Sequence, residues 1–266
     1  MIADLRLCRS LLFLPASNPR AIARARGLEA DMVVLDLEDA VKPEDKDLAR
    51  SAAVEAAALG FAGLCAIRIN SSGPWHSADM AAVAASRADF VVVPMTPGPE
   101  PVIEAARATA RPVLAMIETA KGIVNAAAIA PETAALIAGT NDLAADLGLR
   151  PGGDRGALAT SLQTILLAAR AAGVAAFDGV YNRLDDPEGF EAQCVEGRSF
   201  GFDGKSLIHP SQIGPANRLF GPSEAEIEAA RRLLAAATGG AERFEGEMIE
   251  RMHVEQARRL LAKARA

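Results

Sequence analysis

The sequence feature that most constrains the fold is a regular alternation of short apolar runs with longer segments of helical pattern. The apolar runs are rich in Val, Leu, Ile and Ala, and each is followed by a helical segment. Strands of a parallel sheet are buried on both faces and therefore have nearly continuous apolar sequences. We predict eight such strands, over residues 10–15, 31–39, 63–70, 89–95, 111–119, 133–142, 174–179 and 203–210.

Eight strand–helix units fit the size of a (β/α)₈ TIM barrel, which takes about 250 residues. We therefore predict an α/β fold, with a TIM-barrel catalytic domain over residues 1–220. The alternative is an open doubly wound sheet, which usually has fewer strands and a glycine-rich turn after the first one. Here the first strand is followed by PASNPR, which favours the barrel.

Residues 221–266 exceed what eight strand–helix units require, and their pattern predicts a C-terminal helical extension. Two interpretations of this extension stay open. It could pack along the outside of the barrel. Alternatively, it could hinge at Gly239 and Gly240 and form an arm that reaches a neighbouring subunit.

Composition and charge exclude several classes of function. The net charge is −6 and the two signs are interspersed, so we expect no general attraction to nucleic acid or to an anionic membrane. No apolar segment approaches the roughly 18 residues of a membrane-spanning helix. The N-terminus lacks the pattern of a signal peptide. Cys8, Cys65 and Cys194 are widely spaced and form no CxxC motif, which is typical of a reduced, cytoplasmic protein.

Two carboxylates follow successive predicted strands. Glu118 ends the run RPVLAMI, and Asp142 lies 24 residues later in GTNDL. The carboxyl ends of barrel strands meet at one mouth, and two carboxylates held close together repel unless a cation or proton lies between them. The pair therefore predicts a Mg²⁺ site. As alternatives, Glu118 could cap the next helix or pair with Lys121, and Asp142 could cap its own helix.

Arg68 follows the third predicted strand and faces the acids Asp36 and Glu38, which follow the second. An arginine at a barrel mouth can bind a substrate carboxylate through two parallel hydrogen bonds. The alternative is a structural ion pair between Arg68 and one of the two acids.

Seven motifs between Arg9 and Ile213 occur together and in order. They are RSLLFLPASNPR, LDLEDAV, IRIN, VVPM, IETAKGI, AGTNDLAADLG and DGKSLIHPSQI. Together they resemble the citrate lyase β-subunit-like branch of the HpcH/HpaI aldolase family. The resemblance implies a TIM barrel, a homotrimer or hexamer, Mg²⁺, and a CoA thioester as substrate.

The chemistry that the resemblance implies is carbon–carbon cleavage of a β-hydroxyacyl-CoA, such as citryl-, malyl- or citramalyl-CoA. This lyase reaction releases acetyl-CoA and a 2-keto acid, or runs in reverse as a condensation. Three alternatives stay open: a malyl-CoA-type thioesterase, a CoA-independent 2-keto acid aldolase, and a β subunit that works only with other citrate lyase subunits.

The resemblance also implies roles for individual residues. Glu118 and Asp142 would be the Mg²⁺ ligands. Arg68 would contact the carboxylate and carbonyl of the substrate. Asp36 and Glu38 would position Arg68 and a water molecule on the metal.

Two further assignments rest on the resemblance. Arg9, Arg20 and Arg24 would form a basic surface for the CoA phosphates. In related lyases the C-terminal arm carries a G-x-M-I-D motif whose Asp enters a neighbouring active site, but here the arm reads GEMIE and Glu250 takes that place. Glu250 keeps the carboxylate and adds a methylene, and a positional error near 1 Å can lower a rate by about a hundredfold.

Overall fold

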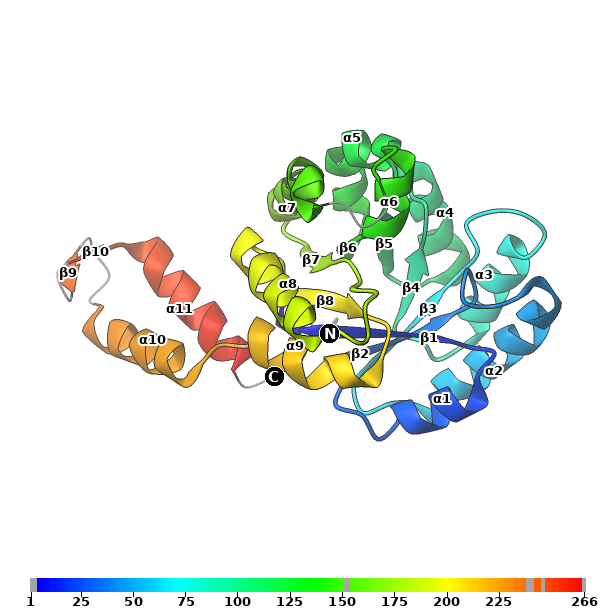
Figure 1. Cartoon of the computed structure of the whole chain (residues 1–266), viewed down its shortest axis with the longest axis horizontal. Helices are drawn as coiled ribbons and strands as arrows, with labels where there is room; N and C mark the ends of the chain where they lie inside the picture. The colour runs from blue at the N-terminus through cyan, green and yellow to red at the C-terminus, as the bar shows by residue number, and fades with distance from the viewer. Residues whose placement is uncertain (1–3, 151–153, 238–241, 245–246, 265–266) are drawn as a thin grey trace.

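The computed structural model describes residues 4–150, 154–237, 242–244 and 247–264. Its eight main strands are parallel and form one closed barrel, in which β8 pairs with β1 (Figure 1). The predicted TIM barrel is therefore confirmed. The strands are β1 Ser10–Pro15, β2 Met32–Asp36, β3 Leu64–Arg68, β4 Phe90–Val93, β5 Val113–Ile117, β6 Ala135–Ala138, β7 Ala175–Asp178 and β8 Gly204–Leu207.

Helices follow the strands and surround the barrel (Figure 1). Several begin where the sequence carries a start signal: Asn18 caps the first helix, and Pro occupies the first turn of three of them. The helices are α1 Pro19–Ala25, α2 Lys46–Leu59, α3 His76–Ala85, α4 Pro99–Thr109, α5 Ala120–Ile129, α6 Thr140–Asp146, α7 Ala159–Ala172, α8 Pro187–Phe200 and α9 Ile213–Phe220.

The apolar residues of the strands form two clusters. One fills the barrel interior and includes Leu11, Met32, Leu114 and Phe177. The other lies between the strands and the surrounding helices. Since alternate residues of a strand point to opposite faces, both clusters draw on the same short runs, which explains why these runs are apolar throughout.

Strand β1 ends at Pro15 as predicted, whereas strands β2 to β8 end one to four residues earlier than predicted. Strand β2 stops at Asp36, so Glu38 and Asp39 belong to the loop that follows. Short 3₁₀ helices, which the sequence did not indicate, lie at Leu5–Leu7, Pro43–Asp45, Ala130–Glu132, Arg155–Leu158 and Pro210–Gln212. Asp36 and Arg68 are the last residues of their strands, whereas Glu118 follows β5 and Asp142 lies in the first turn of the helix Thr140–Asp146.

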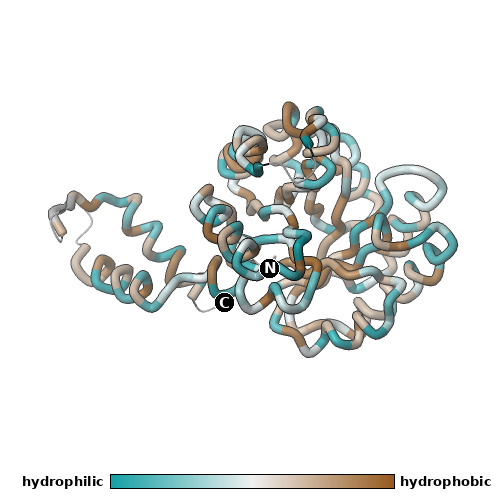
Figure 2. Tube along the Cα trace, in the orientation of Figure 1, coloured by the Kyte–Doolittle hydropathy of each residue, from teal (hydrophilic) through white to brown (hydrophobic). Residues whose placement is uncertain are grey.

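The C-terminal extension contains α10 Glu224–Ala236 and α11 Arg251–Lys263, which pack against each other and project from the barrel beside α8 and α9 (Figure 1). An antiparallel pair of short strands, β9 Glu242–Phe244 and β10 Glu247–Ile249, lies at the far end of this projection. Hydrophilic and hydrophobic positions alternate along the helices (Figure 2). The predicted hinge residues Gly239 and Gly240 lie outside the described residues.

The base of the extension is fixed to the barrel by polar contacts. Lys263 Nζ donates to the carbonyl of Asp203, and Arg198 Nη2 lies 2.6 Å from Glu226 Oε1. Within the part of the chain that the structure describes, no helix has the length and apolar character needed to cross a membrane.

Candidate active site

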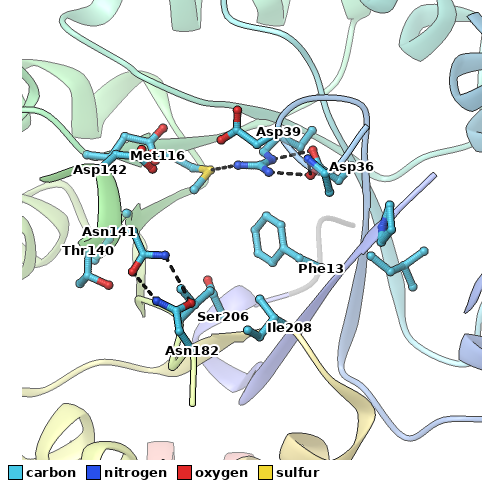
Figure 3. A pocket seen from close by; sticks show the side chains of 18 residues that line it. Phe13, Asp36, Asp39, Met116, Thr140, Asn141, Asp142, Asn182, Ser206 and Ile208 are labelled. Atoms are coloured by element: carbon cyan, nitrogen blue, oxygen red, sulfur yellow. Dashed lines mark hydrogen bonds and ion pairs between the residues drawn. The ribbon is translucent and has the colours of Figure 1, made fainter. Parts of the chain in front are cut away.

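A cavity of about 410 Å³ lies at the carboxyl ends of the strands (Figure 3). It is lined by the predicted site residues Asp36, Arg68, Glu118 and Asp142, but not by Glu38, together with apolar side chains of β1 and of the segments that follow β7 and β8. Its lining includes Phe13, Leu14, Pro15, Asp36, Asp39, Arg68, Met116, Glu118, Gly139, Thr140, Asn141, Asp142, Val180, Asn182, Ser206 and Ile208.

Arg68 is held by two acids. Its Nε and Nη2 atoms donate to the two carboxylate oxygens of Asp36 at 2.7 and 2.6 Å, and its Nη1 lies 2.8 Å from Glu38 Oε2. Burial by itself would lower the pKa of Arg68, but the hydrogen bonds and charges of these acids raise it above its ordinary value. Arg68 is therefore a fixed cation, and the structural ion pair that was the alternative interpretation of Arg68 is present, with both acids.

Glu118 is buried and oriented from two sides. Its Oε1 accepts a hydrogen bond of 2.5 Å from the backbone N–H of Met95, which has a left-handed conformation with φ of 49°. On the other side lies Gly139, where an added Cβ would be 2.3 Å from both Cβ and Oε2 of Glu118. Only glycine lets the chain pass this close to the carboxylate.

The pKa of Glu118 is raised to about 7, mainly by burial and also by the nearby charge of Asp142, while the hydrogen bond from the Met95 N–H acts in the opposite direction. Neither helix-cap alternative is present. Thr119 caps α5 by accepting from the Gly122 N–H, and α6 has Gly139 at its N-cap. Nor does Glu118 share the environment of Lys121, because Lys121 is exposed and Glu118 is buried.

The donor set of Glu118 and Asp142 fits Mg²⁺. Both side chains supply hard oxygen donors to one cavity, and their like charges oppose each other when no cation lies between them. The described residues contain no group of three or more His, Cys, Asp or Glu side chains that could hold a metal. Two carboxylates suffice for Mg²⁺, which keeps several water ligands and binds substrate oxygens.

Glu38 is a second acid of the site whose pKa is strongly raised. Burial raises its pKa to about 8, while the charge of Arg68 acts against this rise and Asp39 adds to it. The loop that carries Glu38 is fixed by Lys46, whose Nζ donates to the carbonyls of Leu37 and Glu38 at 2.7 and 2.8 Å. The same ammonium group donates to Asn70 Oδ1 at 2.7 Å, so it holds β2 and β3 together above the barrel.

Several site residues were not identified from the sequence. They are Lys46, Met95, Gly139, Ser206 and Asn182, whose Nδ2 donates at 2.8 Å to Oδ1 of Asn141, a residue that the sequence placed at the end of the sixth strand. For Lys46 a signal existed, because a lysine follows the LDLEDAV motif. The others depend on contacts between separate strand ends.

A second groove adjoins the cavity and contains two of the three predicted CoA-binding arginines. Arg20 and Arg24 of α1 are exposed and line this groove with residues of β1 and with His209. The cavity and the groove are both lined by Phe13, Leu14, Pro15 and Ile208. The groove and the cavity therefore lie side by side and share these residues as a common wall.

Arg9 does not belong to this surface, and our expectation for it is corrected. It precedes β1, so it lies at the amino end of the barrel, whereas Arg20 and Arg24 come after the carboxyl end of the same strand. Its guanidinium pairs with Asp31 through hydrogen bonds of 3.0 and 2.9 Å. Arg9 thus stabilises the start of the barrel on the face opposite the cavity.

Glu250 also lies away from the cavity of its own chain. It is exposed and immediately precedes α11, next to β10 on the projecting extension (Figure 1). Its backbone N–H donates to His253 Nδ1 at 2.9 Å. The structure therefore brings together Asp36, Glu38, Arg68, Glu118 and Asp142, but not Glu250.

Comparisons with known proteins agree with this architecture. A (3S)-malyl-CoA thioesterase of Cereibacter sphaeroides is 43% identical over 271 residues, covering 97% of this chain and 95% of the relative. A citrate lyase subunit beta-like protein of Deinococcus radiodurans is 38% identical and covers 98% and 99% of the two chains.

Among solved structures, the protein CitE from Mycobacterium tuberculosis, in complex with magnesium, acetoacetate and coenzyme A, superposes with a TM-score of 0.83. The two are 35% identical, and the match covers 98% of this chain and 100% of CitE. Residues 9–210 match the sequence profile of the HpcH/HpaI aldolase/citrate lyase family. Because the profile spans most of the barrel and the relatives span nearly the whole chain, this protein belongs to the HpcH/HpaI aldolase/citrate lyase family of enzymes.

Proposed function

We propose that this chain is a Mg²⁺-dependent enzyme that hydrolyses a malyl-CoA-like thioester. The observation that carries the substrate class is that two neighbouring hollows share lining residues. One holds a carboxylate pair and a fixed arginine, and the other runs past two exposed arginines. A short hydroxy acid joined to CoA has matching parts: a hydroxyl and a carboxylate at one end, and phosphates at the other.

In this proposal the hydroxy acid end lies beside Glu118, Asp142 and Arg68. Glu118 and Asp142 would hold Mg²⁺, which would supply Lewis-acid stabilisation of charge on the substrate. Arg68 adds positive charge at the substrate carboxylate, and Asp36 keeps the guanidinium plane in place. The CoA portion follows the groove, where Arg20 and Arg24 contact its phosphates.

Glu38 is our candidate for the proton acceptor. Its raised pKa and its position beside Arg68 suit a group that takes a proton from water near neutral pH. The water oxygen would bond to the acyl carbon as its proton moves to Glu38. The carbon–sulfur bond then breaks, and the sulfur leaves as the thiolate of CoA. The products are the free hydroxy acid and CoA.

Hydrolysis is favoured over carbon–carbon cleavage by the relatives. The (3S)-malyl-CoA thioesterases are 42 and 43% identical to this chain, whereas the citrate lyase beta and beta-like proteins are 33 to 38% identical. Both reactions would use the same carboxylate pair, so the metal site does not distinguish them.

Carbon–carbon cleavage is the second candidate, and the similarity to CitE in complex with magnesium, acetoacetate and coenzyme A favours it. It would give acetyl-CoA and a 2-keto acid. In that reaction Glu250 of one subunit would donate a proton to the acetyl carbon in the cavity of another. This arrangement requires a homotrimer, a hexamer or another assembly in which the extensions cross between subunits. It also leaves room for other lyase subunits as partners.

We also propose a cytoplasmic location. Cys8, Cys65 and Cys194 are buried free thiols, and burial raises the pKa of each to about 12. Free, unreactive thiols fit a reducing compartment.

The test is product analysis with malyl-, citramalyl- and citryl-CoA in the presence of Mg²⁺. Hydrolysis of malyl-CoA yields malate and free CoA, whereas cleavage yields acetyl-CoA and glyoxylate. We expect free CoA as the first product, and no turnover with Glu118→Ala. The appearance of acetyl-CoA instead would support the second candidate. If none of the three thioesters is consumed, or if Glu118→Ala keeps the same Mg²⁺ requirement and rate, the proposal is refuted.

A further inference from the structure

Ser206 is a buried hydroxyl group without a hydrogen-bond partner in the cavity wall. Its side chain lies on β8, the residue is 1% exposed, and its Oγ has no partner among the described residues. Figure 3 shows it between Asn182 and Ile208, across the cavity from Asp39. Buried hydroxyl groups in proteins are nearly always hydrogen-bonded, so an unpaired one in a cavity suggests a missing ligand atom.

We infer that the Ser206 hydroxyl donates a hydrogen bond to the thioester carbonyl oxygen of the bound substrate. This inference rests on the proposed function. The position of Ser206 identifies the oxygen: Ile208, two residues further along, and Phe13 on the adjacent strand β1 line both the cavity and the arginine groove. A thioester that spans the two hollows has its carbonyl near this wall when its hydroxy acid end lies at Glu118.

The rest of this wall offers few competing donors. Phe13, Val180 and Ile208 are apolar. Asn182 already donates to Asn141 Oδ1 at 2.8 Å. The Ser206 hydroxyl therefore need not break an existing protein hydrogen bond before it binds the substrate, so its bond to the carbonyl would cost little reorganisation.

The geometry assigns Ser206 the role of a donor rather than a nucleophile. A serine nucleophile needs a base within hydrogen-bond distance, and Ser206 Oγ has no such partner in the described structure. As a donor it serves either reaction. The carbonyl oxygen gains negative charge when water adds to the acyl carbon, and it also gains negative charge when carbon–carbon cleavage leaves an enolate.

The test compares Ser206→Ala with Ser86→Ala. The Ser86 hydroxyl is also buried, but it donates to the Val83 carbonyl at 2.8 Å and accepts from the Ala88 N–H at 3.1 Å, at the end of α3. We expect Ser206→Ala to lower kcat/KM for the thioester by about 10²-fold. Its melting temperature should equal or exceed that of the wild type, because an unpaired buried hydroxyl is removed. Ser86→Ala should lower the melting temperature and leave kcat/KM unchanged.

A binding measurement isolates the carbonyl contact. Isothermal titration should show that Ser206→Ala raises the Kd of acetyl-CoA by about tenfold. The Kd of CoA, which lacks the thioester carbonyl, should stay the same. Two results would overturn this inference alone. One is an active wild type together with a Ser206→Ala variant of equal kcat/KM, and the other is an equal loss of affinity for acetyl-CoA and CoA in Ser206→Ala. A wild type that neither binds CoA nor consumes any of the three thioesters would overturn the proposed function and this inference together.

Discussion

Replacing Gly139 with alanine should damage the metal site without unfolding the barrel. Gly139 has φ of −94° and ψ of 78°, so its backbone conformation does not itself exclude alanine. The new Cβ would lie 2.3 Å from Cβ and Oε2 of Glu118, and ordinary contact begins at 3.4 Å. Glu118 and the α6 start must therefore separate by the difference, about 1.1 Å.

A displacement of this size is large for a metal ligand and for a reacting group. A shift near 1 Å can lower a rate by about a hundredfold, and loss of support for a ligand weakens metal affinity by about 10- to 100-fold. We expect Gly139→Ala to show both losses. Magnesium titration of turnover and isothermal titration of Mg²⁺ in the absence of substrate measure them separately.

The matched control is Gly214→Ala in α9, where an added Cβ meets no atom within 4 Å. This variant should keep wild-type Mg²⁺ affinity and turnover. Circular dichroism should show the same helix content in both variants. A folded Gly139→Ala protein with wild-type Kd for Mg²⁺ and wild-type kcat/KM would refute the argument that Gly139 fixes the Glu118 carboxylate.

Three further predictions concern the charged groups. A lysine in Arg68→Lys cannot make the two parallel hydrogen bonds that Arg68 makes with Asp36. Steady-state kinetics should therefore show kcat/KM lower by about 10- to 100-fold. A wild-type kcat/KM would contradict the role of the planar guanidinium. Because the folded-state pKa of Glu118 is raised from 4.5 to about 7, the stability it contributes without metal is present below pH 4.5 and is lost as the pH rises through 7. Mg²⁺ should reverse this loss, so the rise in melting temperature on adding Mg²⁺ should become larger between pH 4.5 and 7. In Glu118→Gln this rise should not depend on pH. An equal Mg²⁺ effect at all pH values in the wild type would exclude Glu118 as a ligand. Glu250→Gln should lose carbon–carbon cleavage yet bind Mg²⁺ normally, and mixing it with Glu118→Ala should partly restore cleavage if extensions cross between subunits. A mixture no more active than its two components would argue against crossing.

The barrel was predictable because its evidence is local. Most strands are continuous apolar runs, and several helices have start or stop signals of their own, as at Asn18 and Gly173. The strand ends were less predictable. Asp36, Glu38 and Asp39 form one acidic stretch in the sequence, but the ladder stops at Asp36.

Contacts at the site were harder to predict because they depend on strand register. Glu118 and Asp142 follow adjacent strands, so a general rule for parallel barrels was enough to place them in one cavity. The contacts of Glu118 with Gly139 and Met95 require the positions of three separate loops. The error for Arg9 has a simpler origin: residues before and after one strand lie at opposite ends of a barrel, however close they are in sequence.

The exposure of Met95 also bears on how oxidants would affect this protein. The three thiols are buried, and with pKa values of about 12 they hold almost no thiolate at neutral pH. The Met95 side chain is 40% exposed, and its backbone N–H holds the Glu118 carboxylate. Peroxide would therefore reach the exposed thioethers of Met95, Met248 and Met252 before any cysteine. A methionine sulfoxide is polar and enzymatically reversible, so oxidation would act on Met95 and on the extension and leave the buried core intact.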